Sequence, residues 1–123
     1  MSVGTVLVVD DNPTNLKLIS VLLRTQGYSV RTATSADEAW ISLQEQLPDL
    51  VLMDVVLPGM SGFQATRALT RDAATSKIPV LIVSTKSMET DRAWGMRQGA
   101  VDYVVKPPRE EDLLERINQL VTA

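Results

Sequence analysis

The sequence predicts an α/β fold in which a doubly wound parallel sheet of five strands carries helices on both faces. One observation is a set of five short runs of apolar or β-branched residues with few polar interruptions. Such runs are typical of strands buried on both faces, and would be wrong for a sheet with one face in water. The other observation is that each run is followed by a segment with apolar residues at helical spacing. This alternation favours a parallel sheet between two layers of helices.

Each predicted strand is bounded by residues that end helices or form turns. Pro79, for example, immediately precedes the fourth run. In chain order the predicted strands are Thr5–Val9, Tyr28–Ala33, Leu50–Met53, Val80–Val83 and Val101–Val105.

The first two helices have recognisable start signals. Asn12 is a good helix cap, and Pro13 follows it at the first helical position. Ser35 and Glu38 form a capping box, in which a serine caps the helix and a glutamate follows three residues later. The side chains of these helices that are expected to face the sheet are Leu16, Ile19, Leu22, Leu23, Ala36, Ala39, Trp40, Leu43 and Leu47.

Three further helices are predicted in the second half of the chain, at Phe63–Asp72, Met88–Gln98 and Arg109–Val121. The last of these has a clear apolar stripe at helical spacing. Its inward residues are expected to be Leu113, Leu114, Ile117, Leu120 and Val121.

Polar and charged residues stand where the predicted strands end. Asp10 and Asp11 follow the first strand, Asp54 the third, Ser84 the fourth and Lys106 the fifth. Parallel strands bring these ends to one edge of the sheet, where open α/β sheets place their sites. Carboxylates gathered there repel one another, and a divalent cation or a phosphoryl group would relieve the repulsion. The residue types suggest magnesium-assisted phosphoryl transfer to a carboxylate.

Composition excludes several classes of function. The chain has 123 residues, the length of one domain, and a net charge of −3. It contains no histidine and no cysteine, which excludes His-based catalytic triads, thiolate metal sites and disulfides. No block of lysine and arginine stands out, so we do not expect nucleic-acid binding. No signal peptide or membrane-spanning segment is evident, and we expect a cytoplasmic protein without membrane contact.

The chain resembles a response-regulator receiver domain of two-component signalling over essentially its full length. The matching residues are Val8-Val9-Asp10-Asp11, Asp54 with Leu57-Pro58-Gly59-Met60-Ser61-Gly62, Ser84-Thr85, and Gly99-Ala100 with Tyr103 and Lys106-Pro107. The resemblance implies one receiver domain over residues 1–123 with no output domain. It also implies a flavodoxin-like sheet with strand order 2-1-3-4-5.

The resemblance makes Asp54 the phosphoacceptor, which receives its phosphoryl group from a histidine kinase. Asp10 and Asp11 are then expected to hold Mg²⁺ together with Asp54 and the backbone carbonyl of Val56. In receivers the positions of Val56 and Lys86 flank the path of the attacking water, so these two residues are predicted to tune the phosphoryl lifetime. Such a protein catalyses only its own phosphorylation and dephosphorylation, and is otherwise not an enzyme.

By the same resemblance, Ser84 and Lys106 are expected to contact the phosphoryl oxygens. Tyr103 is expected to be an aromatic switch that moves inward when Ser84 is drawn to the phosphate. Phosphorylation would then be read out by a protein partner on the surface of the fourth helix, the fifth strand and the fifth helix. The Lys106–Pro107 peptide bond is expected to be cis, which is rare enough to need a structural reason.

Two stretches of the chain resemble a particular group of receivers. Ser84-Thr85-Lys86 and the segment Asp91–Ala100 are similar to stand-alone receivers of pilus-chemosensory systems, which govern twitching and gliding. This predicts a role in motility. A flagellar chemotaxis-type receiver and a general phosphorelay shuttle are the alternatives.

Other classes of protein also place a carboxylate or a phosphate at this edge of a sheet. A phosphatase of the haloacid dehalogenase class needs a second Asp two residues after its nucleophile, and here that position is Val56. A flavodoxin needs a first loop that accepts a phosphate, which Asp10 and Asp11 would repel. A purely structural interaction module is the third alternative, and its response to beryllofluoride with Mg²⁺ would distinguish it from a receiver.

Trp94 is predicted to be partly exposed and to contribute to the docking of a partner. In its helix we expect Ala93, Met96 and Ala100 to form the inward stripe, which leaves the indole outside it. Aromatic residues are enriched among those that dominate the energies of interfaces. The alternative is that the indole packs flat over the preceding helix.

Overall fold

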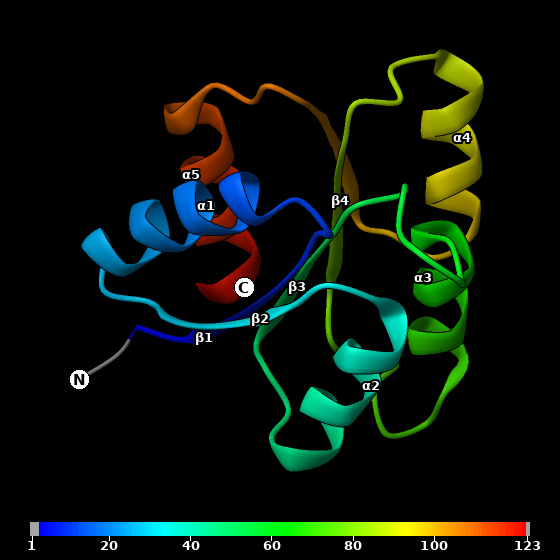
Figure 1. The fold of residues 1–123 in the computed structure, drawn as a ribbon, viewed down its shortest axis with the longest axis horizontal. Coiled ribbons are helices and arrows are strands. Elements are labelled where there is room, and N and C mark those ends of the chain that lie inside the picture. Colours follow the sequence, from blue (N-terminus) through cyan, green and yellow to red (C-terminus); the bar gives the residue numbers. More distant parts are fainter. Residues whose placement is uncertain (1–2, 123) are drawn as a thin grey trace.

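A parallel sheet of five strands runs through the molecule between two layers of helices (Figure 1). The computed structural model describes residues 3–122. Its strands are β1 (Thr5–Val9), β2 (Ser29–Ala33), β3 (Leu50–Met53), β4 (Val80–Ser84) and β5 (Asp102–Val105). Its helices are α1 (Pro13–Thr25), α2 (Ala36–Glu45), α3 (Gly62–Arg71), α4 (Glu89–Arg97) and α5 (Glu110–Thr122). The strand order is β2-β1-β3-β4-β5, so the expected fold class and order are confirmed.

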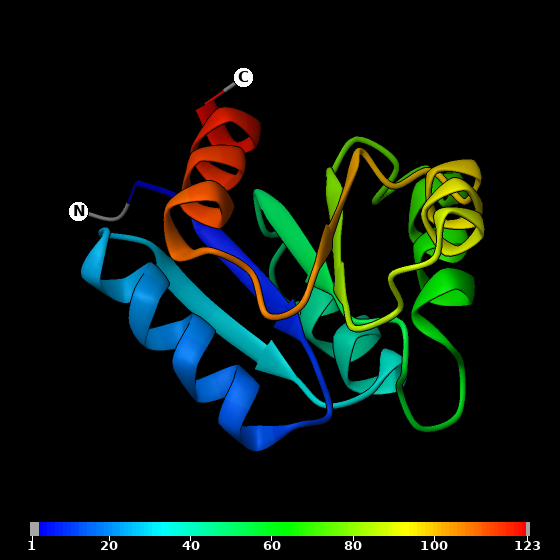
Figure 2. The same ribbon diagram turned by 90° about the horizontal axis from the view of Figure 1, so that it is seen from above.

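The two layers of helices are built by alternation along the strands. Val6 and Val8 belong to a core that β1 shares with α1 and α5, and Leu7 and Val9 to a core shared with α2 and α3. Figure 1 shows α1 and α5 together on one side of the sheet, and α2, α3 and α4 on the other. Figure 2 shows the same arrangement from above, with α3 and α4 side by side. Burial on both faces explains why β1, β3 and β4 are almost entirely apolar, whereas the edge strand β2 carries Ser29, Arg31 and Thr32.

The helix starts follow the local sequence closely. Asn12 caps α1, since its side chain accepts hydrogen bonds from the backbone N–H groups of Thr14 and Asn15. Ser35 caps α2 by accepting from the N–H of Glu38. Every predicted boundary in the second half of the chain lies within one residue of the observed one. The helices and strands, though not the order of the strands in the sheet, were therefore predictable from capping residues and periodicity.

Two details of helix packing were predicted wrongly. Leu47 does not lie on the inner face of α2, because that helix ends at Glu45 and Gln46 has extended backbone; Leu47 is 52% exposed. In α4, Ala93 and Met96 are exposed, although Ala100, which follows the helix, is buried as expected. The buried residue of α4 is instead Gly95, where a Cβ atom would lie 2.8 Å from Ile82 Cδ1. The helix approaches the sheet through its backbone, which an apolar pattern does not reveal.

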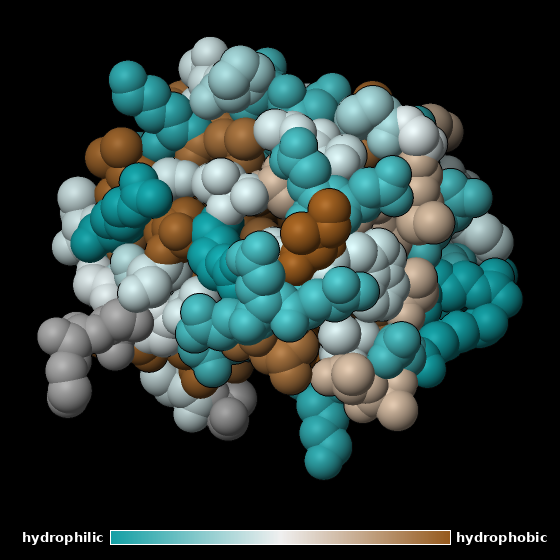
Figure 3. Space-filling model, turned by 60° about the horizontal axis from the view of Figure 1, so that its bottom comes forward, coloured by the Kyte–Doolittle hydropathy of each residue, from teal (hydrophilic) through white to brown (hydrophobic). Residues whose placement is uncertain are grey.

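The face of the molecule drawn in Figure 3 carries both hydrophobic and hydrophilic residues. On the face drawn in Figure 3, hydrophobic residues lie among hydrophilic ones without forming one continuous patch. Within residues 3–122 we find no helix whose length and apolar character would let it cross a bilayer.

Candidate functional site

The ends of β1 and β3 bring two carboxylates together. Val9 pairs with Met53 in the parallel register, and the N–H of Asp54 donates to the Val9 carbonyl over 2.9 Å. Asp10 and Asp54 therefore leave adjacent strands at the same level. Both are buried, with exposed fractions of 2% for Asp10 and 8% for Asp54. Strand polarity thus placed these two residues correctly at the carboxyl edge of the sheet.

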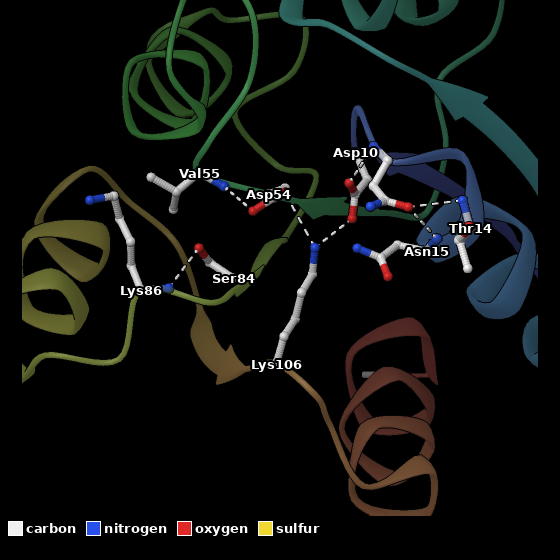
Figure 4. Close-up of polar contacts among 9 residues, drawn as sticks. Asp10, Thr14, Asn15, Asp54, Val55, Ser84, Lys86 and Lys106 are labelled. Atoms are coloured by element: carbon white, nitrogen blue, oxygen red, sulfur yellow. Dashed lines mark hydrogen bonds and ion pairs between the residues drawn. The ribbon is translucent and has the colours of Figure 1, made fainter.

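Lys106 lies between the two carboxylates (Figure 4). Its Nζ donates to Asp10 Oδ2 at 2.5 Å and to Asp54 Oδ2 at 3.2 Å. The backbone N–H of Lys106 donates to the Ser84 carbonyl at 2.9 Å, which fixes the end of β5 beside β4. The Lys106–Pro107 peptide bond is cis, as expected. One buried cation therefore partly balances the acidic residues of the site.

The charge of Asp54 is disfavoured by its surroundings. Burial raises the pKa of the Asp54 carboxyl, the nearby charge of Asp10 raises it further, and the Lys106 ammonium opposes both effects. Asp54 Oδ1 also accepts the N–H of Val55 at 2.8 Å, which favours the charged form. The net result is a pKa above the ordinary value for an aspartate. A second cation at this edge would therefore stabilise the charged form of Asp54, which Lys106 alone does not fully balance.

Three carboxylates stand close enough to hold one metal ion. Oxygen atoms of Asp10, Asp11 and Asp54 all lie within 4.8 Å of one another, and Asp11 is the exposed member. Asp11 makes no hydrogen bond or ion pair within residues 3–122. It is not the cap of α1, because Asn12 has that role. The donor set is all oxygen, which fits Mg²⁺, an ion that binds few protein carboxylates and retains waters.

The remaining residues assigned to the metal or to phosphoryl lifetime lie at the rim. Val56 is 55% exposed, and its carbonyl accepts no hydrogen bond from the described part of the chain. The side chain of Lys86 is exposed and lies on the side of Asp54 away from Asp10 (Figure 4). Both are thus near the site and accessible to water.

Ser84 and Tyr103 are linked through the backbone of Lys86. Ser84 is fully buried, and its Oγ accepts the N–H of Lys86 at 3.2 Å. The Tyr103 hydroxyl donates to the carbonyl of Lys86 at 2.7 Å. Tyr103 is only 2% exposed, and burial raises the pKa of its hydroxyl. The structure therefore contains Tyr103 in an inward position, held by the loop that leads into α4.

Gly62 supports Asp54 from behind and was missed as a site residue. A Cβ atom at Gly62 would lie 1.9 Å from the Asp54 carbonyl oxygen, so only glycine fits. Its N–H donates to the Val55 carbonyl at 2.8 Å. The resemblance to receivers included Gly62 in a matching motif but gave this glycine no role of its own. Gly62 is required because α3 approaches the end of β3 closely. No local sequence pattern indicates this approach.

Trp94 lies on the side of α4 away from β5. It is 49% exposed, so the predicted partial exposure is confirmed. The guanidinium of Arg92 contacts β5, because it donates to the carbonyl of Tyr103. Two helical steps of about 100° each place Trp94 on the opposite flank from Arg92.

An open groove of about 400 Å³ adjoins the site between α1 and the segment after β5. Lys106 and Thr85 line the end near the carboxylates. Its apolar part consists of Leu18, Ile19, Leu22, Pro107, Pro108 and Leu113. Leu18 is 65% exposed, so this rim of the site presents apolar surface to water.

Comparison with known families decides between the classes of protein that share such an edge. A sequence model of the response regulator receiver domain matches residues 6–118. The chain belongs to this family. Receiver domains are signalling proteins rather than metabolic enzymes, so the phosphatase and flavodoxin alternatives are set aside.

Relatives of known sequence cover nearly all of this receiver domain. Protein PilH of Pseudomonas aeruginosa is 49% identical over 116 residues, which make up 94% of this chain and 96% of PilH. The phosphate regulon transcriptional regulatory protein PhoB of Rhizobium meliloti is 36% identical, and the match covers 94% of this chain but 51% of PhoB. The chain therefore spans almost all of the first relative and about half of the second.

Solved structures share the same fold. A response regulator from Chloroflexus aurantiacus superposes with a TM-score of 0.93 at 31% identity, covering 98% of both chains. Chemotaxis protein CheY4 of Vibrio cholerae has a TM-score of 0.89 at 30% identity, covering 95% of this chain and 98% of CheY4. A receiver domain of a sensor histidine kinase from Pseudomonas aeruginosa, with a TM-score of 0.89 at 28% identity and 98% coverage of both chains, is described with a magnesium ion coordinated in its active site cleft.

Proposed function

We propose that this receiver domain is a stand-alone response regulator that accepts a phosphoryl group on Asp54 from a histidine kinase. The observation that carries the proposal is the position of Lys106, whose ammonium lies between the buried carboxylates of Asp10 and Asp54. In the transfer, an Asp54 carboxylate oxygen forms a bond to phosphorus. The bond between phosphorus and the donor imidazole nitrogen breaks, and its electron pair stays on that nitrogen.

Asp10, Asp11 and Asp54, with the carbonyl of Val56, are the residues that would hold Mg²⁺. The bound ion would neutralise charge on the phosphoryl oxygens during transfer. The oxygen-only donor set and the exposed position of Asp11 support this assignment.

Lys106 and Ser84 are proposed to hold the phosphoryl oxygens. The Lys106 ammonium already makes two hydrogen bonds to carboxylates, and an incoming anion would compete for the same donor. The Ser84 hydroxyl accepts from Lys86 and still has its own proton to donate. Donation from Ser84 to a phosphoryl oxygen would draw its side chain toward Asp54. Preorganised donors of this kind stabilise charge that develops in transfer.

The switch is proposed to consist of Ser84 and Tyr103, read out on α4, β5 and α5. Both side chains contact the backbone of Lys86, so a change at one alters the support of the other. Trp94 is proposed as a partner contact at the margin of this surface, on the flank of α4 away from β5. Replacing Trp94 with Ala should reduce capture of partners by the phosphorylated chain with little loss of stability. The reverse result would assign the indole to packing.

The kinase has to cover the rim of the site to reach Asp54. The apolar groove beside Lys106 provides a surface on that rim for a protein donor. For the pathway we propose pilus-chemosensory motility, supported by 49% identity to PilH and by the stretch Asp91–Ala100. The protein is proposed to act in the cytoplasm. A flagellar chemotaxis-type receiver is the second candidate, supported by the structural similarity to CheY4.

Mass spectrometry tests the assignment of the phosphoacceptor. The chain is incubated with acetyl phosphate and Mg²⁺, and the adduct is mapped after reductive trapping. We expect one modified residue, Asp54, and no adduct in Asp54→Asn. Asp37→Asn is the matched control, because Asp37 is an exposed aspartate in the first turn of α2. Undiminished labelling of Asp54→Asn would refute the proposal.

Beryllofluoride distinguishes a receiver from a passive scaffold. In the presence of Mg²⁺ it should bind the wild-type chain and raise its thermal unfolding midpoint, because a ligand that binds only the folded state stabilises it. Asp54→Asn should show no such increase. An equal response of both chains would mean that the ligand binds elsewhere.

A further inference from the structure

Tyr103 lies in β5, at the edge of the sheet, and its backbone is held by side chains. An edge strand presents N–H and C=O groups that no neighbouring strand can pair. The N–H of Tyr103 donates to Asp102 Oδ1 at 2.8 Å. The carbonyl of Tyr103 accepts from Arg92 Nη1 at 3.2 Å. The side chains of Asp102 and Arg92 therefore make the hydrogen bonds to the Tyr103 backbone that a neighbouring strand would otherwise make.

These two contacts are parts of one closed ring. Arg92 Nη2 lies 3.6 Å from Asp102 Oδ1, the same oxygen that accepts the N–H of Tyr103. The ring passes from Tyr103 through Asp102 and Arg92 and returns to Tyr103. The other oxygen of Asp102 accepts from Arg116 Nη1 at 2.5 Å, which ties the ring to α5. One carboxylate thus joins α4, β5 and α5.

Tyr103 is also fastened to α4 at its other end. Its hydroxyl donates to the carbonyl of Lys86, in the loop that leads into α4. Between the two attachments, Gly95 of α4 packs against the tyrosine ring, where a Cβ atom would lie 3.1 Å from Tyr103 Cδ2. Any movement of α4 along β5 must therefore break the contact of Arg92, the contact of Lys86, or both.

We propose that Arg92 is a positioning residue that couples α4 to the inward position of Tyr103. Its guanidinium holds the peptide of Tyr103 in register with α4, and the ring then fills the space above Gly95. Loss of Arg92 releases the backbone of the edge strand from α4 and lets the tyrosine ring leave its buried position. The role of this coupling in signalling rests on the proposed function. The coupling itself is a property of the unphosphorylated chain.

The chemistry of arginine suits this task. Its planar fork can donate to a carbonyl and approach a carboxylate from neighbouring nitrogens. A lysine has one nitrogen and would satisfy these acceptors less completely. The Arg92 side chain is 54% exposed, so its ion pair is screened by water and adds little to overall stability. The constraint that it places on geometry is the larger effect, and a stability measurement alone would miss it.

Fluorine NMR provides a readout of the position of Tyr103. The chain contains two tyrosines, so protein made with meta-fluorotyrosine gives two signals, and Tyr28→Phe identifies the one from Tyr103. The difference in chemical shift between H₂O and D₂O measures exposure of the fluorine. The experiment uses the full chain without phosphodonor or metal. We expect a small difference for Tyr103 in the wild type, and in Arg92→Ala a rise toward the value of free fluorotyrosine.

Two further variants complete the test. Arg97 lies in the same helix, and its side chain makes no ion pair or hydrogen bond within residues 3–122. Arg97→Ala should therefore leave the Tyr103 signal unchanged. Arg92→Lys should give an intermediate value. Thermal unfolding is measured for each variant. An unchanged Tyr103 signal in Arg92→Ala, even with lowered stability, overturns the proposal, and so does an equal change in Arg97→Ala. Either result leaves phosphorylation of Asp54 as a separate question.

Discussion

The ammonium of Lys106 donates to the carboxylate of Asp10 over 2.5 Å, although the two residues are 96 positions apart in the chain. Both side chains are buried, with exposed fractions of 9% for Lys106 and 3% for Asp10. A buried ion pair is not strong evidence for stability by itself, but breaking one by removing a single partner is costly. The pair therefore makes the metal-free site dependent on one lysine.

Lys106→Ala should destabilise the metal-free chain by about 3 kcal/mol, because it leaves two buried carboxylates without a cation. Urea unfolding in the presence of a chelator measures the effect. Lys86→Ala is the control, since that lysine is exposed and makes no side-chain ion pair within the described residues. Addition of Mg²⁺ should restore part of the loss in Lys106→Ala. Equal stability of the two variants would show that the acidic residues do not need Lys106.

Asp54→Asn should stabilise the metal-free fold at neutral pH. The pKa of Asp54 is raised, mainly by burial, so the folded state binds more protons than the unfolded state. Its stability must then fall as the pH rises through the range that begins near the ordinary aspartate value of about 4. The asparagine removes this part of the fall, so the two chains should converge below that range. Urea unfolding across pH tests this, and an unchanged pH profile in Asp54→Asn would contradict it.

Asp11→Ala should weaken Mg²⁺ binding by on the order of tenfold, which corresponds to about 1.4 kcal/mol. The metal-free chain should be as stable as the wild type or more so, because the change removes one of three mutually repelling carboxylates. Asn12→Ala is the contrasting variant and should cost about 1 kcal/mol through loss of the α1 cap. Calorimetry gives the affinity and urea unfolding the stability. Clear destabilisation by Asp11→Ala would make Asp11 a structural residue.

Gly62→Ala should destabilise the fold by about 3 kcal/mol or more, because the added Cβ meets a backbone oxygen that cannot easily move away. Gly59→Ala is the matched variant. Gly59 has a φ of 73° with nothing near its Cβ position, so alanine there should cost only about 1 kcal/mol. Thermal unfolding compares the two. A milder effect at Gly62 than at Gly59 would mean that the end of β3 yields to α3.

Val56→Asn should shorten the lifetime of the phosphorylated chain by about threefold or more, which is less than 1 kcal/mol of barrier at the lower limit. An amide at this exposed position can orient a water that an isopropyl group cannot. Met60→Asn in the same loop is the control, since Met60 is also exposed. The measurement is the decay of labelled protein after the phosphodonor is removed. An unchanged decay rate in Val56→Asn would exclude a role for this residue.

Strand polarity explains why so much of the fold and site was accessible from the sequence. Apolar runs identified the strands, and parallel strands bring their carboxyl ends to one edge. Asp10, Asp54, Ser84 and Lys106 could therefore be placed together from the sequence alone. The strand order came from family resemblance, because the runs themselves do not specify which strands are neighbours. Roles in phosphorylation remain predictions, since the geometry supports them without testing them.

The features that were missed depend on contacts between residues distant in the chain. Gly62 and Gly95 matter because a backbone approaches closely there, and a glycine in a loop or helix carries no sign of that approach. No role was predicted for Arg92 or Asp102, since their contact at the edge of β5 requires the finished sheet. Ala93 and Met96 were placed inward because an apolar pattern was expected to mark the buried side of α4.

The span between Asp10 and Lys106 has a consequence for the chain as it is made. The chain is synthesised from its amino terminus, so Asp10 and Asp54 leave the ribosome before Lys106. Any pairing of β1 with β3 at that stage would bring Asp10 and Asp54 together without their lysine. At that stage the carboxylates of Asp10 and Asp54 have no Lys106 ammonium to balance their charge. Intracellular divalent cations would then act as folding partners of the growing polypeptide before they serve any signalling chemistry.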